Sequence, residues 1–174
     1  MMRNSSTAAR LGGFTLIEAV VVLVVAGVLA TIGAAVMSSA FRTYFLGREI
    51  ANDDWQGRFA LERMTRELRT VRTASAGDLN IGVAGQVTFA DSSGNAIVYR
   101  RNAATSELER SQDNGATFLP LADSVSALTF SYLQNDGQTT AVSASAVYFI
   151  TATVTVASTN LTTVYRATVK PAAF

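Results

Sequence analysis

The stretch GGFTLIEAVVVLVV, residues 12–25, opens a long apolar run that has one carboxylate, Glu18, near its start. No charged residue occurs from 19 to 37, and residues 14–17 extend the run on the other side of Glu18. A helix rises about 1.5 Å per residue, so about 20 residues cross the roughly 30 Å hydrocarbon core of a membrane. We therefore predict a membrane-spanning helix over residues 14–37.

Two other interpretations of this run stay open. A core helix buried inside a globular domain is also apolar, although it is usually shorter. A secretory signal peptide would be removed by a cut after the apolar part, where Met37-Ser38-Ser39-Ala40 offers small residues. The helical period continues beyond residue 40, which favours a helix that stays in the protein.

The placement of arginines predicts how this helix is oriented. Arg3 and Arg10 precede it with no acidic residue beside them, so the short amino-terminal segment should stay in the cytoplasm. Arg42 and Arg48 follow the helix on its far side and weaken this inference. We expect a single-pass protein of the inner membrane whose carboxy-terminal part is periplasmic.

Glu18 needs a reason, because a charge at the centre of a membrane helix costs about 2.5–3.5 kcal/mol, and less near the interface. A cut between Gly13 and Phe14 would create an ammonium group one turn from Glu18, about 6 Å along the axis. The ammonium of a neighbouring molecule could neutralise this carboxylate in a low-dielectric setting, where opposite charges attract more strongly than in water. A glutamate solvated by lipid headgroups is the alternative, and the residues alone leave both open.

The motif Gly-Phe-Thr-Leu-Ile-Glu, residues 13–18, resembles the processing signature of type IV prepilins and pseudopilins. The resemblance implies a leader over residues 1–13, a peptidase cut after Gly13 and N-methylation of the new terminus, Phe14. It also implies that Glu18 guides assembly. The expected partners are then the prepilin peptidase/N-methyltransferase, other pilin or pseudopilin subunits and the inner membrane.

An apolar stripe continues the helical period beyond the apolar run. Its members are spaced by three, four or seven positions: Leu46, Ile50, Gly57, Leu61, Met64, Leu68 and Val71. We predict an amphipathic helix over residues 38–74 whose stripe is covered by a sheet of the same chain. The block RFALERMTRELR, residues 58–69, resembles minor pilins of the PilW and mannose-sensitive-haemagglutinin types and J-type minor pseudopilins.

From residue 75 the period changes from helical to two, which is typical of strands. Hairpins are expected over 86–101 and 106–121, with turns at 91–95 and 113–115, and further strands over 125–133, 146–156 and 162–170. The side chains expected to face inward are Val87, Phe89, Ile97, Tyr99, Leu128, Phe130, Tyr132, Tyr148, Ile150, Ala152, Val154 and Val156. We predict an α+β fold in which the long helix packs on an antiparallel β-sheet head, residues 75–174. The resemblance implies the same plan.

Composition excludes several classes of site. The chain has no cysteine and no histidine, so it has no Cys/His zinc site, disulfide or His-based triad. Residues 1–13 hold two of the 14 basic side chains and none of the 13 acidic ones, so the remainder is slightly acidic and no nucleic-acid partner is expected. Asp91, Asp113 and Asp136 offer calcium-type oxygens, but hairpin turns favour such residues too. We expect no enzyme, cofactor or metal.

Three functional hypotheses follow. The first is a structural minor pilin, made as a prepilin and incorporated into a type IV pilus. The second is a J-type minor pseudopilin of a type II secretion system, which uses the same physics in a short periplasmic piston. The third, from another class, is an uncleaved membrane-anchored periplasmic binding or sensor domain that keeps residues 1–13.

Overall fold

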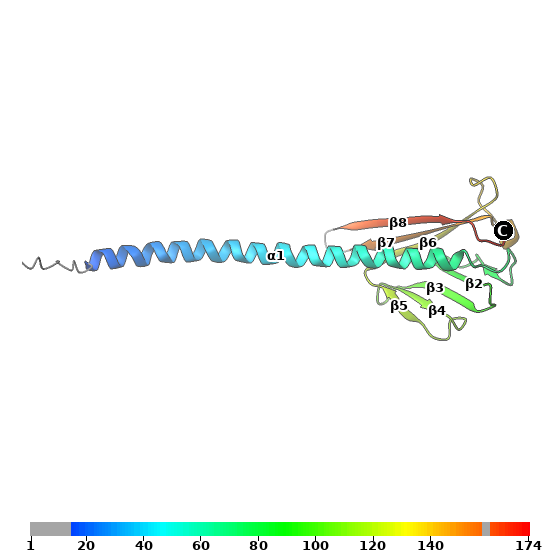
Figure 1. Ribbon diagram of the computed structural model, residues 1–174, viewed down its shortest axis with the longest axis horizontal. Coiled ribbons are helices and arrows are strands. Elements are labelled where there is room, and N and C mark those ends of the chain that lie inside the picture. The colour runs from blue at the N-terminus through cyan, green and yellow to red at the C-terminus, as the bar shows by residue number, and fades with distance from the viewer. Residues whose placement is uncertain (1–14, 158–160) are drawn as a thin grey trace, which may run out of the picture. The chain divides into compact units, whose positions relative to one another are not determined.

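A computed structural model of the chain describes residues 15–157 and 161–174. One helix, α1 (Leu16–Leu68), is followed by strands and a short 3₁₀ helix (Figure 1). The chain divides into two compact units, which meet between Leu46 and Gly47. The expected leader and its cleavage position, Gly13 and Phe14, lie outside the described residues.

The part of α1 in the first unit is bare. Every residue from 15 to 45 is exposed, because no other element covers this segment among the described residues of its unit. Among the described residues, α1 is one helix that is long and apolar enough to cross a membrane, judged by length and composition. The expected apolar helix is therefore present, and it is not the core helix of a globular domain.

The part of α1 in the second unit buries the predicted stripe from Gly57 onward, whereas Ile50 is half-buried. Leu61, Met64 and Leu68 lie in the core, and Val71 follows them there. The helix ends at Leu68, earlier than the residue 74 expected from the sequence. It ends there because the chain turns to join the hairpin: the Arg72 N–H donates to the carbonyl of Ala90 at 2.9 Å.

Within the described part of the chain, eight strands form two antiparallel sheets, where the sequence predicted one. The first sheet has the order β1-β2-β3-β4-β5, with bounds Leu79–Asn80, Gln86–Ala90, Ala96–Asn102, Glu107–Ser111 and Leu119–Ala122. The second has the order β6-β7-β8, with bounds Val125–Leu133, Phe149–Ala157 and Thr162–Val169. The α+β class and the antiparallel pairing are confirmed, and the division into two sheets was not predicted.

Both predicted hairpins are present. In the β2–β3 hairpin Val87 pairs with Tyr99 and Phe89 pairs with Ile97, and all four side chains are buried as expected. The β4–β5 hairpin turns through Asn114 and Gly115, both at positive φ (59° and 86°). A left-handed backbone is unfavourable for most side chains, so Asn-Gly suits this turn.

The start of the long strand differs from the prediction. Residues Ala144–Ala146 form a 3₁₀ helix, and β7 begins only at Phe149. Val147 is consequently buried and Tyr148 is half-exposed, the reverse of the expected faces. A turn of three residues breaks the two-residue alternation, so the predicted faces hold only from β7 onward.

A single hydrophobic core holds α1 and the two sheets of the head together. Its members come from the stripe of α1 and from both sheets. Within this unit β6, β7 and β8 lie along one side of the helix, and β2 to β5 lie along the other (Figure 1). Two sheets clasping one helix explain why a stripe wider than a single seam is buried.

Candidate functional site

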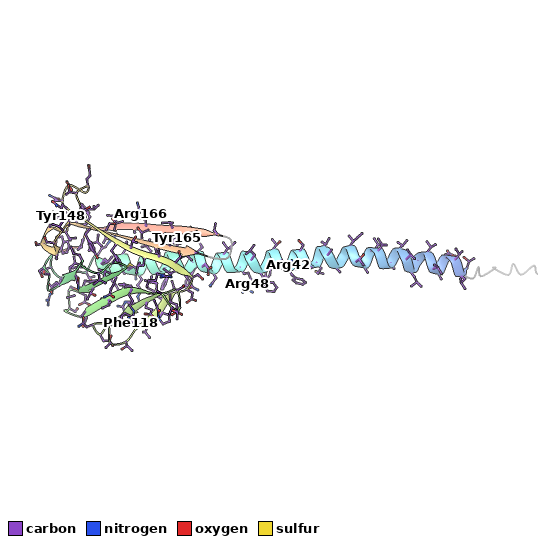
Figure 2. All side chains as sticks on the ribbon, turned by 180° about the vertical axis from the view of Figure 1, so that it is seen from behind. Arg42, Arg48, Phe118, Tyr148, Tyr165 and Arg166 are labelled. Atoms are coloured by element: carbon purple, nitrogen blue, oxygen red, sulfur yellow. The ribbon has the colours of Figure 1, made fainter. Side chains whose placement is uncertain are left out.

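The bare apolar half of α1 is the most unusual surface of the described chain. Its large side chains project outward along residues 16–45 (Figure 2), with exposures such as 63% for Leu29 and 65% for Val36. Soluble proteins rarely expose contiguous apolar patches larger than a few hundred Å². This surface therefore requires a covering of lipid or of other apolar helices.

Glu18 lies in the first turn of α1, next to the helix start. Thr15 precedes the helix, and the Glu18 N–H donates to Thr15 Oγ1 at 3.3 Å. A threonine cap followed three residues later by glutamate is the capping-box pattern, in which each residue's side chain can satisfy the other's backbone N–H. The motif Thr15-Leu16-Ile17-Glu18 carries this signal, and the sequence interpretation above missed it.

Two properties of Glu18 follow from its position in the helix. Its negative charge at the positive end of the helix dipole stabilises α1 locally, by an amount typically of about 0.3–1 kcal/mol. Its side chain is also exposed on the apolar surface, where a neighbouring cation can reach it. Gly13 and Phe14 lie outside the described residues, so the cut and the ammonium it would create stay predictions.

Two exposed aromatic side chains lie on the part of α1 that belongs to the head unit. Trp55 stacks on Phe59, with ring centroids 5.3 Å apart and an angle of 8° between the planes. Trp55 is 64% exposed, so the pair lies outside the core although its helix is anchored there. Rigid aromatic side chains of this kind are enriched where proteins contact partners.

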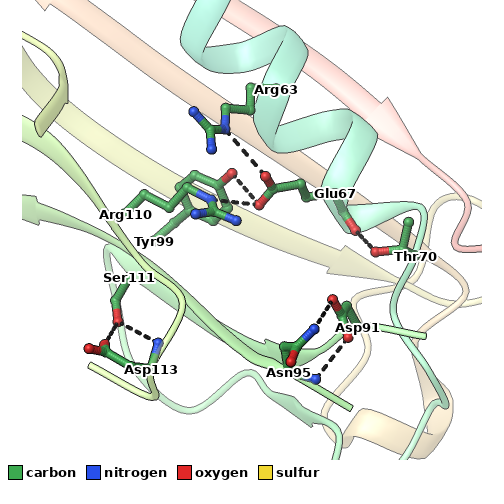
Figure 3. A network of polar contacts seen from close by, with 9 residues as sticks. All are labelled: Arg63, Glu67, Thr70, Asp91, Asn95, Tyr99, Arg110, Ser111 and Asp113. Atoms are coloured by element: carbon green, nitrogen blue, oxygen red, sulfur yellow. Dashed lines mark hydrogen bonds and ion pairs between the residues drawn. The ribbon is translucent and has the colours of Figure 1, made fainter. Parts of the chain in front are cut away.

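Glu67 ties α1 to the first sheet (Figure 3). Its Oε2 accepts from Tyr99 Oη at 2.7 Å and from Arg110 Nε at 2.8 Å, and its Oε1 lies 3.3 Å from Arg63 Nε. Burial raises the pKa of Tyr99, and the bond to Glu67 adds to the rise. Each group in the cluster has a partner, so the arrangement is suited to holding the helix in place.

The three aspartates with calcium-type oxygens lie in separate turns. Asp91 accepts from the N–H groups of Ser93 and Asn95, and Asp136 accepts from those of Gln138 and Thr139. The side-chain bond from Asn95 chiefly lowers the pKa of Asp91, and its backbone bonds add to this.

Asp113 is used in the same way by its own turn. It accepts from Ser111 Oγ at 2.6 Å and from the Thr117 N–H at 2.9 Å. Hydrogen bonds from Ser111 and then Thr117 lower the pKa of Asp113. No three acidic side chains come together to hold a metal ion within residues 15–157 and 161–174.

Gly57 allows the second sheet to approach the helix closely. A Cβ atom placed on Gly57 would lie 2.6 Å from Cε2 of Tyr165 and 3.0 Å from Cγ2 of Val156. The Tyr165 ring therefore lies directly over the helix backbone, and its hydroxyl donates to Asp54. The sequence placed Gly57 on the stripe without identifying this role.

No protein-family model matches the chain, and no curated protein matches it.

Proposed function

We propose that this chain is a structural subunit of a fibre, a minor pilin incorporated into a type IV pilus. In this proposal prepilin peptidase cuts between Gly13 and Phe14, and Phe14 becomes N-methylated. The subunit waits in the inner membrane with its head in the periplasm. The observation that supports this most strongly is the bare apolar half of α1, on a helix whose other half is anchored in a folded head.

One surface serves both states of such a subunit. Lipid covers residues 16–45 before assembly, and the apolar helices of neighbouring subunits cover them afterwards. Because lipid and neighbouring helices are similarly apolar, the transfer between them needs a specific attraction. The carboxylate of Glu18, left without a counter-charge in the membrane and neutralised by the ammonium of a neighbour's Phe14, supplies that attraction and sets the register.

Glu18→Gln tests this role directly. Glutamine also occurs at this position of capping boxes, so the variant removes the charge and keeps a side chain that can cap the helix. We expect cleavage at Gly13 to persist while the amount of the subunit in purified fibres falls by about tenfold, which corresponds to about 1.4 kcal/mol. The measurement is quantitative mass spectrometry of sheared fibres.

Two controls separate charge from other effects. Glu62→Gln removes an exposed carboxylate paired with Arg66 on the same helix, and it should leave incorporation unchanged. Thr15→Val removes the cap acceptor and keeps the Glu18 charge. If Thr15→Val lowers incorporation as much as Glu18→Gln does, helix capping rather than ion pairing is the function of Glu18.

The intact mass of the protein from its native host tests the processing step. We expect a chain that begins with N-methyl-Phe14. Gly13→Glu should block the cut, because a large charged side chain replaces the one residue without a Cβ next to the scissile bond. Normal accumulation of mature-length protein from this variant would contradict the assigned bond.

The same experiments address the two alternatives. A J-type pseudopilin would show the same mass and the same dependence on Glu18, and deletion of the gene would abolish protein export rather than surface fibres. A membrane-anchored binding or sensor domain would keep residues 1–13 and stay indifferent to Glu18→Gln.

A further inference from the structure

A cavity of about 230 Å³ lies in the head unit, between the first turns of α1 in that unit and the adjoining ends of β7 and β8. Its apolar walls include Ile50, Val156 and Leu161, and Tyr165 on β8 (labelled in Figure 2) also lines it. Pockets for small-molecule ligands usually measure about 300–1,000 Å³. This cavity is smaller, and its size suits a single inserted side chain.

A buried carboxylate without a partner lines this cavity. Asp53 is only 9% exposed, and its Oδ2 is fully buried with no hydrogen-bond partner among the described residues. The adjacent Asp54 differs, because its Oδ1 accepts from Tyr165 and its Oδ2 lies 2.9 Å from Arg58 Nε. A buried acceptor left unpaired is unfavourable, so the Oδ2 of Asp53 calls for a hydrogen-bond donor beyond those of the described residues.

The chemistry of the walls defines what is missing. An apolar lining with one free carboxylate oxygen suits a cation carried on an aliphatic stem, as in arginine and lysine. A divalent metal ion such as Ca²⁺ requires about six to eight oxygen ligands. Two carboxylates line the cavity, and both oxygens of Asp54 are engaged, so only Asp53 can serve a further cation there.

We infer that this cavity receives an arginine or lysine side chain from a neighbouring subunit, whose charged end pairs with Asp53. The inference rests on the proposed function, since it is assembly that brings a second subunit to this face of the helix. Charge complementarity then gives the head its own contact with a neighbour, separate from the contact at Glu18. The Oδ2 of Asp53, which has no partner among the described residues, becomes paired on docking.

Binding of a free arginine derivative to the purified full chain in detergent tests the site without requiring assembly. The probe is N-acetyl-arginine amide, and the neutral isostere N-acetyl-citrulline amide is its control. NMR shifts of the Val156 and Leu161 methyl groups report occupancy. We expect saturable binding in the millimolar range, weaker by about tenfold or more for citrulline.

Two variants locate the binding. Asp53→Asn keeps the shape of the side chain, removes its charge and should weaken binding of the arginine probe by about tenfold or more. Asp123→Asn makes the same change at an exposed residue outside the cavity and should leave binding unchanged. Asp53→Asn should melt no lower than the wild type, which shows that the variant is folded. Equal binding by Asp53→Asn and wild type, or no binding to wild type, overturns the inference.

Crosslinking in the native host identifies the source of the cation. A photoreactive residue in place of Leu161, at the cavity wall, should form adducts with a peptide of another subunit that contains arginine or lysine, and Asp53→Asn should abolish them. Adducts with lipid alone, or within the same chain alone, would overturn the inference. If Glu18→Gln is incorporated into fibres as well as the wild type while the arginine probe still binds, the proposed function is rejected and the cation site is retained.

Discussion

The two parts of α1 share one backbone conformation and have opposite surroundings. Residues 16–45 expose every side chain, whereas the part from Gly47 to Leu68 buries a stripe between two sheets. The first part is predominantly apolar on every side, and no other described element of its unit covers it. The second part alternates apolar and charged faces, so sheets of the same chain can cover it. A helix of one geometry therefore presents an exposed apolar surface in one region and forms part of the core in the other.

Replacing a leucine by alanine in each part of the helix tests this difference most directly. Leu68 is fully buried and Leu29 is 63% exposed. We expect Leu68→Ala to lower the free energy of unfolding of the head by about 3–5 kcal/mol, because it leaves a cavity. Leu29→Ala should change it by less than about 0.5 kcal/mol. Urea unfolding of the full chain in detergent, followed by near-ultraviolet circular dichroism, measures both, and similar losses would contradict the division.

Charged residues on the same helix provide a second comparison. Glu67 binds Tyr99 and Arg110 with a side chain that is 20% exposed, whereas Glu62 binds Arg66 with one that is 71% exposed. Glu67→Gln removes the charge opposite the buried Arg110, so we expect a loss of about 2–3 kcal/mol. Glu62→Gln should cost at most about 0.5 kcal/mol. Equal effects in the same urea assay would show that Glu67 does not anchor the helix.

Alanine replacements of Gly33 and Gly57, one in each part of the helix, should also differ in their effect on the stability of the head. A Cβ atom placed on Gly33 would have no neighbouring atom within 4 Å, whereas one placed on Gly57 would lie 2.6 Å from the Tyr165 ring. We expect Gly57→Ala to destabilise the head by about 1 kcal/mol, since overpacking of about 1–3 kcal/mol exceeds the gain in helix propensity of about 1 kcal/mol. Gly33→Ala should leave head unfolding unchanged. A stabilised Gly57→Ala protein would mean that Tyr165 moves aside easily.

The smallest expected effect concerns pH. Hydrogen bonds from Thr139, then from the backbone of Gln138 and Thr139, lower the pKa of Asp136 below its usual value of about 3.9. Because the folded pKa is the lower one, this contribution is complete above about pH 5 and is lost as the pH falls through 4 toward the folded pKa. We expect the thermal midpoint of the head to fall below pH 4.

Asp136→Asn is the control for this pH dependence. The variant cannot ionise at this position, so its midpoint should fall less steeply between about pH 5 and 2 than that of the wild type. Parallel curves for the two proteins, measured by circular dichroism at low salt, would show that the turn carboxylates do not set the acid sensitivity.

Local patterns were sufficient for much of the fold. The apolar run, the stripe and the β2–β3 pairs depend on near neighbours and on periodicity, and the structure reproduces them. The capping pattern at Thr15 and Glu18 was also readable, since the two residues are three positions apart, although it was missed. The faces of Val147 and Tyr148 were wrong because a 3₁₀ turn breaks the alternation there.

Contacts between residues far apart in the sequence could not be predicted from the sequence alone. Glu67 meets Tyr99 and Arg110 across 32 and 43 residues of sequence, and Tyr165 meets Asp54 across 111. No periodicity relates such positions, because the packing of sheets against the helix decides which of many carboxylates finds which donor. The same holds for Asp53, whose sequence neighbour Asp54 is engaged while Asp53 itself faces the cavity.

The sequence by itself determined where the helix is apolar, where it becomes amphipathic and where most of the longer strands begin, since these depend on the order of side chains along the chain. Only the tertiary structure decided that two sheets enclose the stripe, that Glu67 is an anchor, and that Asp53 is buried without a partner among the described residues. Burial and pairing are properties of three-dimensional neighbours. They become fixed when distant segments pack into one core.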